Sequence, residues 1–486
     1  MKGKKIVVLS AMLAGVMALS GVLGGCFAPP PSENVFVQED LAARIDANIP
    51  ENTVADIRVG VRATDAEETI LRGLIEAFNE KYPNIRVTPV RVSGDAYDTT
   101  LVSYIPAGTM PDLFWVNPNN LSYYYNNGVA FTLDNYIKQS NLNTQDYVAA
   151  AMGECQSPAA HYFMMPRDYV QLVMYYNKDL MRQLVAAENE ITAAPSVDWT
   201  WDDFLAYCKA FMQSGLITGD QPVLDVELDW EAVYYPFIRS FGGEIIDEEG
   251  KLVIDEGLDS ETEREENGAY RYLGELLRLK QGWKDNNGKA HSYIYPKQSA
   301  TGASVSFYGG FSPFYIHSRS SLTDAYKAFQ ALGKPDDVGV LPMPAVGETP
   351  ATSAGCTGYA IYRGSEKKDA AWAFLRFMMT QDGQEALEKT GNVVPVMISE
   401  REKENPVWKS YPAGMNVDHD MFLAHSERGI QMDFLRRLPT ATHADAFSYL
   451  RTMYTSVLYE GASRVDSIRL ASDRMYNLLA YNEAKG

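Results

Sequence analysis

Residues 56–92 read DIRVGVRATDAEETILRGLIEAFNEKYPNIRVTPVRV, and the fold can be predicted from this stretch. Apolar residues occupy every second position over residues 57–61, which predicts a β-strand. Apolar residues at a spacing of four over residues 70–78 predict an amphipathic helix, which ends at residues 82–84. Residues 85–92 form a second predicted strand. Strand, helix and strand in this order indicate the start of a parallel sheet covered by helices.

Downstream, the alternation of helices and strands continues. We expect a helix over residues 95–105 and a buried strand over residues 113–116. A second α/β region follows Arg167, where Thr200 and Asp203 form a capping box at the start of a helix. Further expected elements are a hairpin over residues 243–255, helices around residues 273–277 and 371–378, a strand over residues 303–307, and mainly helical structure towards the C-terminus. The predicted fold class is α/β.

Upstream, the chain begins with the features of an export signal. Three lysines within the first five residues precede a largely apolar run that ends at Leu23-Gly24-Gly25-Cys26. Leu-Gly-Gly-Cys resembles the bacterial lipobox, in which the Cys thiol receives a diacylglyceryl group. We therefore expect residues 1–25 to be a lipoprotein signal peptide, with Cys26 holding the protein by acyl chains such as palmitate at the extracytoplasmic face of the bacterial cell membrane. The alternative is an uncleaved membrane helix, since about 18 apolar residues can span a bilayer.

The segment after Cys26 is predicted to be a tether. Pro29, Pro30 and Pro31 open a polar, acidic stretch, and Pro-rich segments are stiff and extended. We therefore expect residues 26–53 to hold the folded body away from the membrane, with a short helix within residues 38–48.

Composition narrows the class of protein. The chain has 486 residues and 46% hydrophobic content, enough for two sizeable cores. Its formal net charge is −20, and residues 1–25 hold three Lys and no acidic residue, so the remainder carries −23. This charge argues against nucleic acid as a partner and against peripheral binding to anionic lipid, because both select basic patches.

Three cysteines remain besides Cys26, and they show no metal or redox spacing. Cys155, Cys208 and Cys356 contain no CxxC pair. Three cysteines allow at most one disulfide. We expect small, buried, free thiols, which are usual in cores, and one disulfide is the alternative.

Catalytic motifs are missing from the sequence. It contains no GxSxG, HExxH, GxGxxG or P-loop pattern. Asp225, Glu227 and Asp229 alternate and suggest either calcium ligands or, more simply, a solvated strand or loop. We expect no cofactor, no metal and no enzymatic activity. The 63 acidic residues leave the paired carboxylates of a glycosidase as an alternative.

Eight short motifs occur in one order along the chain. They are FNEKYPNIRV at residues 78–87, GTMPDL at 108–113, the turn at 128–134, YNKDL at 176–180, the segment at 195–204, GGE at 242–244, GVLPMP at 339–344 and the helix at 370–377. Together they resemble the extracellular solute-binding protein family that serves ABC importers, in its carbohydrate-binding branch. A further segment of the family departs from the usual pattern, because Phe311 follows Gly309-Gly310 where a Trp is expected.

The resemblance implies a monomer of two α/β lobes, each built on a mostly parallel sheet flanked by helices. The ligand is bound in the cleft between the lobes, and the closed form docks on the permease subunits of the importer. On this interpretation one lobe comprises residues 54–167 and 343–395, and the other comprises residues 168–342 and 396–486. The ligand is a carbohydrate, with an oligosaccharide favoured; a non-sugar solute is the alternative.

The candidate ligand contacts follow from strand ends and from the resemblance, because ligands in α/β proteins lie beyond the carboxyl ends of strands. Each candidate has a structural alternative: core packing for the aromatic residues, turn formation for the Asn residues, an N-cap for Asp65 and an internal ion pair for Arg167 with Asp168. The candidates are Asp65, Trp115, Asn117, Asn119, Arg167, Asp168, Tyr169, Trp230, Tyr308, Phe311 and Tyr359.

Overall fold

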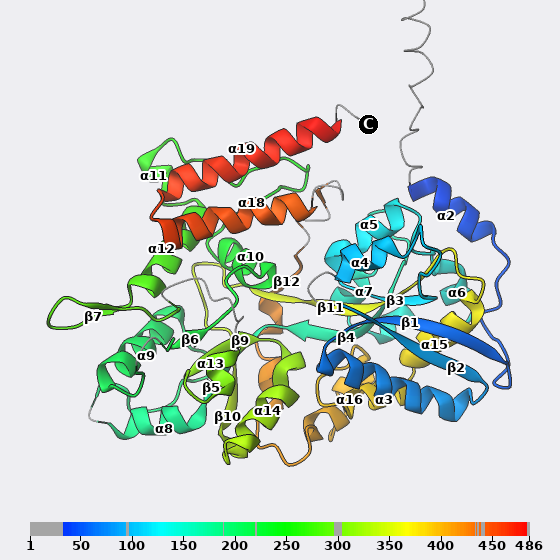
Figure 1. Cartoon of the computed structure of the whole chain (residues 1–486), viewed down its shortest axis with the longest axis horizontal. Helices are drawn as coiled ribbons and strands as arrows, with labels where there is room; N and C mark the ends of the chain where they lie inside the picture. The colour runs from blue at the N-terminus through cyan, green and yellow to red at the C-terminus, as the bar shows by residue number, and fades with distance from the viewer. Residues whose placement is uncertain are drawn as a thin grey trace, which may run out of the picture.

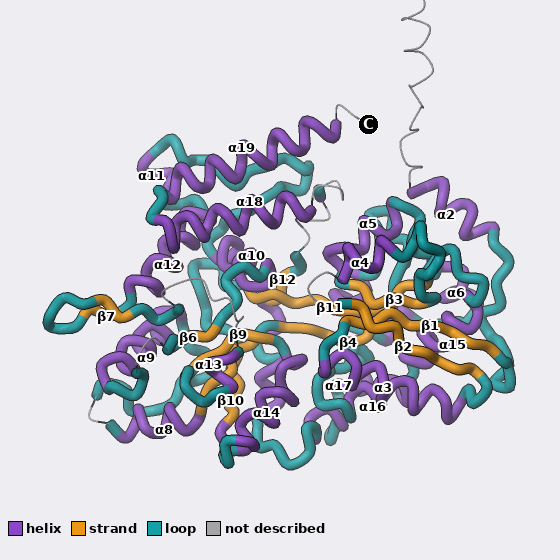
Figure 2. The backbone as a smooth tube through the Cα atoms, viewed as in Figure 1, coloured by secondary structure: helices purple, strands orange, loops and turns teal. Residues whose placement is uncertain are grey.

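The computed structural model shows two lobes side by side, with strands running between them (Figures 1 and 2). It describes residues 33–93, 97–187, 189–218, 221–295, 304–432, 434, 437–438 and 443–483. The predicted signal peptide, residues 1–25, and the predicted lipidation site Cys26 lie outside the described residues.

The first lobe is built on a six-stranded mixed sheet. Its strands are β1 (Ala55–Arg62), β2 (Ile85–Val92), β3 (Leu113–Val116), β4 (Met165–Gln171), β11 (Thr352–Ile361) and β12 (Gly429–Ile430). The order is β12-β11-β3-β1-β2, with β4 paired to β11. β1 is parallel to β2 and β3, which confirms the parallel unit predicted from residues 56–116.

Helix α3 (Asp65–Lys81) shows why this unit forms. Thr64 caps the helix by accepting a hydrogen bond from the Glu67 amide at 3.3 Å. Ile70, Leu74 and Phe78 are buried against the sheet, as their spacing predicts. The other helices of this lobe are α4 (Tyr97–Ser103), α5 (Leu121–Asn126), α6 (Asp134–Gln139), α7 (Ala149–Glu154), α15 (Lys368–Met378), α16 (Gln381–Glu388) and α17 (Ile398–Arg401).

The second lobe has a smaller sheet of different pairing. Its strands β5 (Val173–Asn177), β6 (Leu224–Asp225), β9 (Phe314–His317) and β10 (Val338–Pro342) run in the order β10-β5-β9-β6. β5 is antiparallel to both β9 and β10, and β6 is parallel to β9. The α/β class is confirmed, but the expectation of a mostly parallel sheet is wrong for this lobe. β5 runs away from the crossing from Val173, whereas β9 and β10 run back towards it and end at His317 and Pro342, which both pair with Val173.

Helices cover the second sheet, and two C-terminal helices pack on the outside of this lobe. These helices are α8 (Lys178–Ala186), α9 (Trp201–Ser214), α10 (Glu231–Ser240), α11 (Glu261–Arg264), α12 (Gly268–Gln281), α13 (Val305–Tyr308), α14 (Leu322–Ala331), α18 (His443–Thr455) and α19 (Arg464–Glu483). The predicted capping box at Thr200 and Asp203 is present at the start of α9. Figure 1 shows α18 and α19 lying over α10 and α12.

The lobes are connected by strands, as the resemblance implies. β4 in the first sheet leads into β5 in the second sheet with only Leu172 between them. β11 returns the chain from the second lobe and pairs with β3 and β4. Figure 2 shows β4 and β11 running between the two bodies. The first sheet therefore extends to Gln171, four residues beyond residue 167, where the predicted segment of this lobe ends.

Two local predictions need correction. The described part of residues 303–307 belongs to helix α13, not to a strand, because a short apolar run fits a buried helical turn as well as a strand. The hairpin predicted over residues 243–255 is reduced to a turn with a single antiparallel bridge between Ile246 and Leu252.

The N-terminal segment is only partly a tether. Residues 33–53 pack on the first lobe, beginning with helix α2 (Glu33–Ala42), which starts earlier than predicted. Asp40 is buried, accepts a hydrogen bond from the Thr132 amide at 3.1 Å and pairs with Arg363 Nε at 2.8 Å. This ion pair explains why the polar segment docks instead of extending freely. Among the described helices, none is long and apolar enough to cross a membrane.

Candidate functional site

The candidate site lies where strands of both lobes end at the crossing. β1 ends at Arg62 and the parallel β3 ends at Val116, so their carboxyl ends share one edge of the first sheet. In the second lobe, His317 at the end of β9 pairs with Val173, the first residue after the crossing. Carboxyl ends of strands from both sheets therefore meet at the lobe boundary, where ligands of open α/β proteins bind.

A polar hollow of about 330 Å³ separates the lobes at this boundary. This is at the lower end of the range of roughly 300–1,000 Å³ for small-molecule sites. The first lobe lines it with Asn117, Asn119 and Asn120, and the second lobe with Asp229, Glu231, Phe447, Ser448 and Arg451. Because every lining residue except Phe447 is polar, the hollow suits a solute that makes many hydrogen bonds.

Hydrogen bonds on two sides of the boundary connect the lobes. Asn119 Nδ2 donates to Glu231 Oε1 at 3.3 Å, beside the hollow. On the other side, Thr323 at the start of α14 donates from its Oγ1 and its amide to Asn392 Oδ1, at 2.7 and 3.3 Å. The lobes are therefore in contact in this conformation, and Asn119 with Glu231 is a contact that a bound solute can replace or reinforce.

Arg62 covers the face of Trp115. The guanidinium carbon lies 5.3 Å from the centre of the indole ring, and Tyr97 packs edge-on against the same ring at 5.4 Å. Trp115 is only 4% exposed, and its Nε1 has no hydrogen-bond partner among the described residues. In this conformation Trp115 is a packed side chain under a cation, and a ligand must displace Arg62 to stack on it.

Arg62 acts electrostatically on half-buried carboxyl groups of both lobes, Asp98 and Glu231. Asp98 accepts hydrogen bonds from Tyr124 Oη at 2.6 Å and Asn120 Nδ2 at 2.9 Å. Burial raises the pKa of Asp98 and of Glu231, and Arg62 acts against this shift in both cases. Arg62 is thus an electrostatic link between a carboxyl group of the first lobe and one of the second.

Arg167 and Asp168 form a buried ion network beneath the cleft. Arg167 is 1% exposed, pairs with both carboxylate oxygens of Glu67 and donates from Nη2 to Asp168 Oδ2 at 2.7 Å. Asp168 Oδ1 accepts from the amide and hydroxyl of Thr357 at 2.9 and 2.7 Å. Burial alone would lower the pKa of Arg167, but Asp168 and Glu67 outweigh it and raise that pKa.

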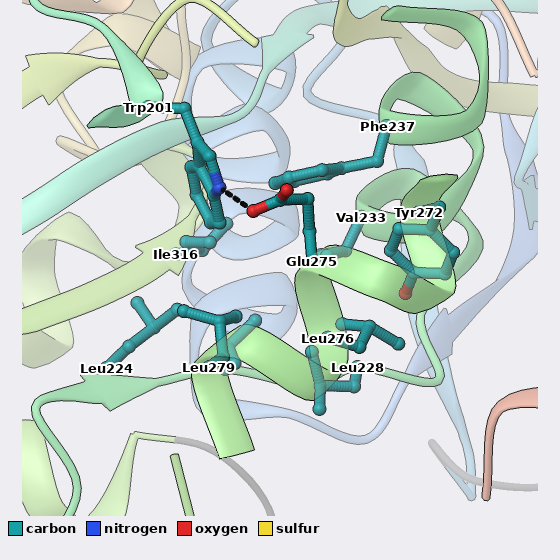
Figure 3. A pocket seen from close by; sticks show the side chains of 11 residues that line it. Trp201, Leu224, Leu228, Val233, Phe237, Tyr272, Glu275, Leu276, Leu279 and Ile316 are labelled. Carbon is teal, nitrogen blue, oxygen red and sulfur yellow. Dashed lines mark hydrogen bonds between the residues drawn. The ribbon is translucent and has the colours of Figure 1, made fainter. Parts of the chain in front are cut away.

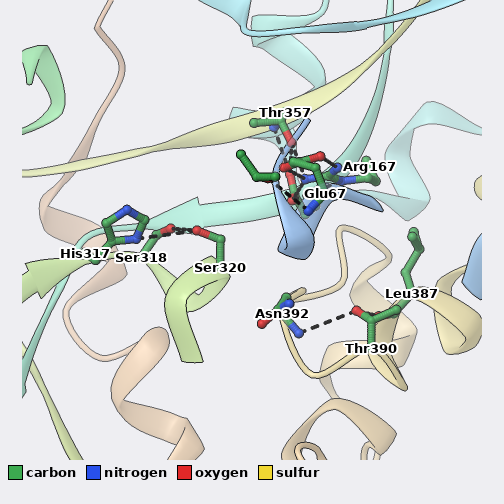
Figure 4. Close-up of polar contacts among 11 residues, drawn as sticks. Glu67, Arg167, His317, Ser318, Ser320, Thr357, Leu387, Thr390 and Asn392 are labelled. Atoms are coloured by element: carbon green, nitrogen blue, oxygen red, sulfur yellow. Dashed lines mark hydrogen bonds and ion pairs between the residues drawn. The ribbon is translucent and has the colours of Figure 1, made fainter. Parts of the chain in front are cut away.

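The geometry of this network favours the structural interpretation of Arg167 and Asp168. Both oxygens of Asp168 are already bonded within the protein, and the network ties α3 to the two crossing strands β4 and β11. Figure 4 shows Glu67, Arg167 and Thr357 together at the crossing, with His317, Ser318 and Ser320 of the second lobe to one side.

The second lobe contributes an aromatic pair at the site. Trp230 is the N-cap residue of α10, and its ring lies 5.1 Å from that of His317 with the planes 36° apart. The pKa of His317 is lowered to about 4, mainly by burial and in smaller part by the charge of Arg62. The imidazole is therefore neutral at neutral pH, and its Nδ1 lies 3.5 Å from Ser320 Oγ.

The neutral His317 predicts an acid-sensitive fold. A histidine has a pKa of about 6.5 in the unfolded chain, so between pH 6.5 and about 4 only the unfolded state takes up this proton. Stability linked to His317 is present above pH 6.5 and is lost as the pH falls to 4, by up to about 3 kcal/mol. His317→Asn should flatten the decline of the urea midpoint between pH 7.5 and 4.5.

His291→Asn, in the β7 (Trp283–Lys284) and β8 (Ala290–His291) hairpin away from the cleft, is the matched control. It should leave the decline unchanged. An equal decline in wild type and His317→Asn would contradict the assignment.

Asp65 is not the N-cap residue of α3, and its charge acts on the second lobe. Thr64 is the N-cap of α3, and Asp65 is the first helical residue, with an exposed side chain. Burial raises the pKa of Asp324 on α14, and the charge of Asp65 adds to this rise across the boundary. The two lobes therefore present like charges to each other at this point.

The remaining candidates lie away from the hollow. Tyr169 is buried under Arg401, and Tyr359 is fully buried beside Arg167. Tyr308 is half-buried against Tyr315, inside the second lobe. Phe311 is 58% exposed and precedes β9, at the opposite end of that strand from His317. The structure thus brings Trp115, Asn117, Asn119 and Trp230 to the lobe boundary and leaves Tyr169, Tyr308 and Phe311 away from it. Tyr359 pairs with Trp115 across the strands but is fully buried.

Several residues of the site were not predicted from the sequence. Arg62 ends the first strand and follows from the same strand-end rule as Trp115. Glu231 adjoins the predicted Trp230, and Asn120 adjoins Asn119. Phe447, Ser448 and Arg451 come from α18, far along the chain, and no local pattern marks them.

A second cavity belongs to the core of the second lobe (Figure 3). Its volume is about 10 Å³, enough for no more than one water molecule. Trp201 Nε1 donates to Glu275 Oε2 at 2.7 Å at its edge, among apolar side chains. It is too small to hold a solute.

Asp225, Glu227 and Asp229, suggested above as calcium ligands, differ in burial. Asp225 is fully buried and accepts a hydrogen bond from the Phe307 amide at 3.0 Å, whereas Glu227 and Asp229 are exposed. Within the described parts of the chain, no three His, Cys, Asp or Glu side chains gather as a metal site would require.

One family of known proteins matches most of the chain. The model of the bacterial extracellular solute-binding proteins matches residues 63–385, which span the crossing strands and most of both lobes. No curated protein sequence matches the chain.

Solved structures share the fold at low sequence identity. The GacH receptor of Streptomyces glaucescens, solved unliganded and with acarbose, has a TM-score of 0.68 at 18% identity over 88% of this chain and 99% of that chain. An ABC substrate-binding protein from Listeria monocytogenes, in complex with cycloalternan, has a TM-score of 0.69 at 17% identity over 88% and 100%. UgpB from Mycobacterium tuberculosis, in complex with glycerophosphocholine, has a TM-score of 0.67 at 15% identity over 89% and 99%.

Proposed function

The chain belongs to the bacterial extracellular solute-binding protein family, and from this premise we propose that it is a lipid-anchored receptor for a carbohydrate, favouring an oligosaccharide. It holds the sugar between its lobes and delivers it to the permease subunits of an ABC importer. The family consists of binding proteins, and we propose that this member binds its solute without turnover.

The observation that carries this proposal is the polar hollow at the lobe boundary. Amide groups of Asn117, Asn119 and Asn120 face the carboxylate of Glu231 and the guanidinium of Arg451 across it. Such planar polar groups form paired hydrogen bonds with neighbouring sugar hydroxyls. Structures with similar folds contain acarbose and cycloalternan, which supports a carbohydrate.

The aromatic residues of the site suggest how a sugar is taken up. In this conformation Arg62 covers Trp115 and His317 covers Trp230. A sugar ring that takes the place of Arg62 or His317 gains an aromatic face for its C–H surface. Arg62 is then free to bond sugar hydroxyls beside Asp98 and Glu231.

The first experiment is a thermal-shift screen with maltose, maltotriose, maltotetraose, acarbose, cycloalternan and glycerophosphocholine. A solute that binds only the folded state adds about 2.7 kcal/mol at a hundredfold excess over Kd. We expect at least one oligosaccharide to raise the melting temperature and to be recovered intact after hours with the protein.

Two other outcomes would contradict the proposal in different ways. Release of reducing ends from the oligosaccharides by the pure protein would favour a glycoside hydrolase. A shift with glycerophosphocholine alone would favour a non-sugar solute.

The proposed anchor rests on Leu23-Gly24-Gly25-Cys26 and is tested separately. Cys26→Ala removes the thiol that would carry the diacylglyceryl group, so lipid labelling and detergent partitioning of the protein should both be lost. Cys208→Ala is the matched control, since that thiol is buried in α9. Unchanged lipid labelling in Cys26→Ala would refute the anchor.

A further inference from the structure

We propose that Cys155 and Cys356 form a disulfide in the mature protein, joining α7 to the crossing strand β11. The two Sγ atoms lie 4.0 Å apart, although 201 positions separate them in the sequence. Cys208 lies in α9, within the core of the second lobe, and is not part of this pair.

The two side chains converge on the same buried space. Cys155 is the C-cap of α7 and is fully buried, and Cys356 is 5% exposed. Both Sγ atoms point to the carbonyl oxygen of Ala151, at 3.2 and 3.5 Å. A disulfide needs an S–S distance of about 2.05 Å, so each sulfur has to move by about 1 Å.

A separate contact already holds the two backbones together. Glu154, directly before Cys155, accepts a hydrogen bond from the Cys356 amide at 2.7 Å through its buried carboxylate. The residue next to one cysteine therefore fixes the backbone of the other. This contact holds the end of α7 against β11, so the two cysteines stay close without a covalent bond.

The compartment of this family favours the oxidised form, because disulfides persist outside the cytoplasm. One cysteine thiolate attacks the disulfide of an oxidant and forms a mixed disulfide, releasing one oxidant thiol. The second cysteine then attacks that mixed disulfide, forms the internal bond and releases the other oxidant thiol. Two electrons pass to the oxidant, and both cysteines lose their protons. Burial raises the pKa of Cys356, which disfavours its thiolate once β11 is packed.

The Cys155–Cys356 disulfide would constrain the crossing strand β11. Cys356 is next to Thr357, which contacts both Arg167 and Asp168. A covalent link at this place fixes β11 to the first lobe while leaving the second lobe free to move. It also closes a long loop in the unfolded chain, which stabilises the folded state.

The test is thiol counting on the full chain carrying Cys26→Ala. The protein is unfolded, refolded with reduced and oxidised glutathione, and alkylated under denaturing conditions without a reductant. We expect one alkyl group, on Cys208, and a digest peptide pair linking Cys155 to Cys356. Cys208→Ser should keep this pair and carry no alkyl group, and reduction of the refolded protein should lower its melting temperature.

Three alkyl groups after refolding would overturn the proposal, as would a glutathione adduct in place of the internal bond or a link that involves Cys208. Peptide mapping of the three native cysteines decides between these outcomes. It needs no substitution of Cys155 or Cys356, which could prevent folding.

Discussion

Arg167→Met should destabilise the protein by about 3–5 kcal/mol, because it leaves two buried carboxylates without their cation. Arg167 pairs with Glu67 and Asp168, whose side chains are 12% and 5% exposed. Methionine keeps the apolar part of the side chain, so the loss of stability comes from removing the charge and its hydrogen bonds. The urea midpoint at neutral pH is the measurement.

The control for this variant is Arg86→Met. Arg86 pairs with Asp56 at 2.5 Å, but the two side chains are 76% and 59% exposed. Exposed pairs contribute about 0–1 kcal/mol, so this variant should stay close to wild type. Equal effects of the two substitutions would show that the network under the cleft is not a stabilising element.

Trp115→Ala should cost about 3–5 kcal/mol of apo stability, which is typical of large-to-small changes in a core. The side chain is 4% exposed and packs between Tyr97 and Arg62. The sequence left ligand stacking and core packing open for this residue, and the structure favours packing in the ligand-free state. Urea unfolding of the apo protein checks the expected loss.

Trp230→Ala is the matched comparison, because Trp230 is only partly buried and stacks on His317. Its apo stability should fall less than that of Trp115→Ala. Unchanged apo stability of Trp115→Ala, with an affinity roughly thirtyfold weaker, would show instead that Trp115 is an open stacking platform.

Much of the first lobe could be predicted because its elements carry local signals. Residues 57–61 alternate, residues 70–78 repeat at helical spacing, and Tyr82-Pro83 lies at the helix end, although the N-cap is Thr64 and not Asp65. The second sheet could not be predicted in the same way. Its strands β5, β6 and β9 are short, and their antiparallel pairing depends on the crossing from β4, which is a tertiary property.

The site was only partly predictable for a similar reason. Trp115 and Asn117 follow a recognisable strand, so the strand-end rule places them at the boundary. Whether a side chain such as Asp168 is free for a ligand depends on partners far away in the sequence, here Thr357. Arg451 reaches the hollow because α18 packs on the second lobe, which no local pattern indicates.

The most direct test of solute capture between the lobes is a calorimetric titration of the oligosaccharide that raises the melting temperature most. Wild type, Glu231→Ala and Phe311→Ala are titrated in parallel. Glu231 lines the hollow and bonds Asn119, whereas Phe311 lies at the opposite end of β9 from it. We predict that Glu231→Ala weakens affinity at least tenfold, about 1.4 kcal/mol, while Phe311→Ala binds like wild type. Unchanged affinity in Glu231→Ala, or a loss confined to Phe311→Ala, would contradict binding in the cleft.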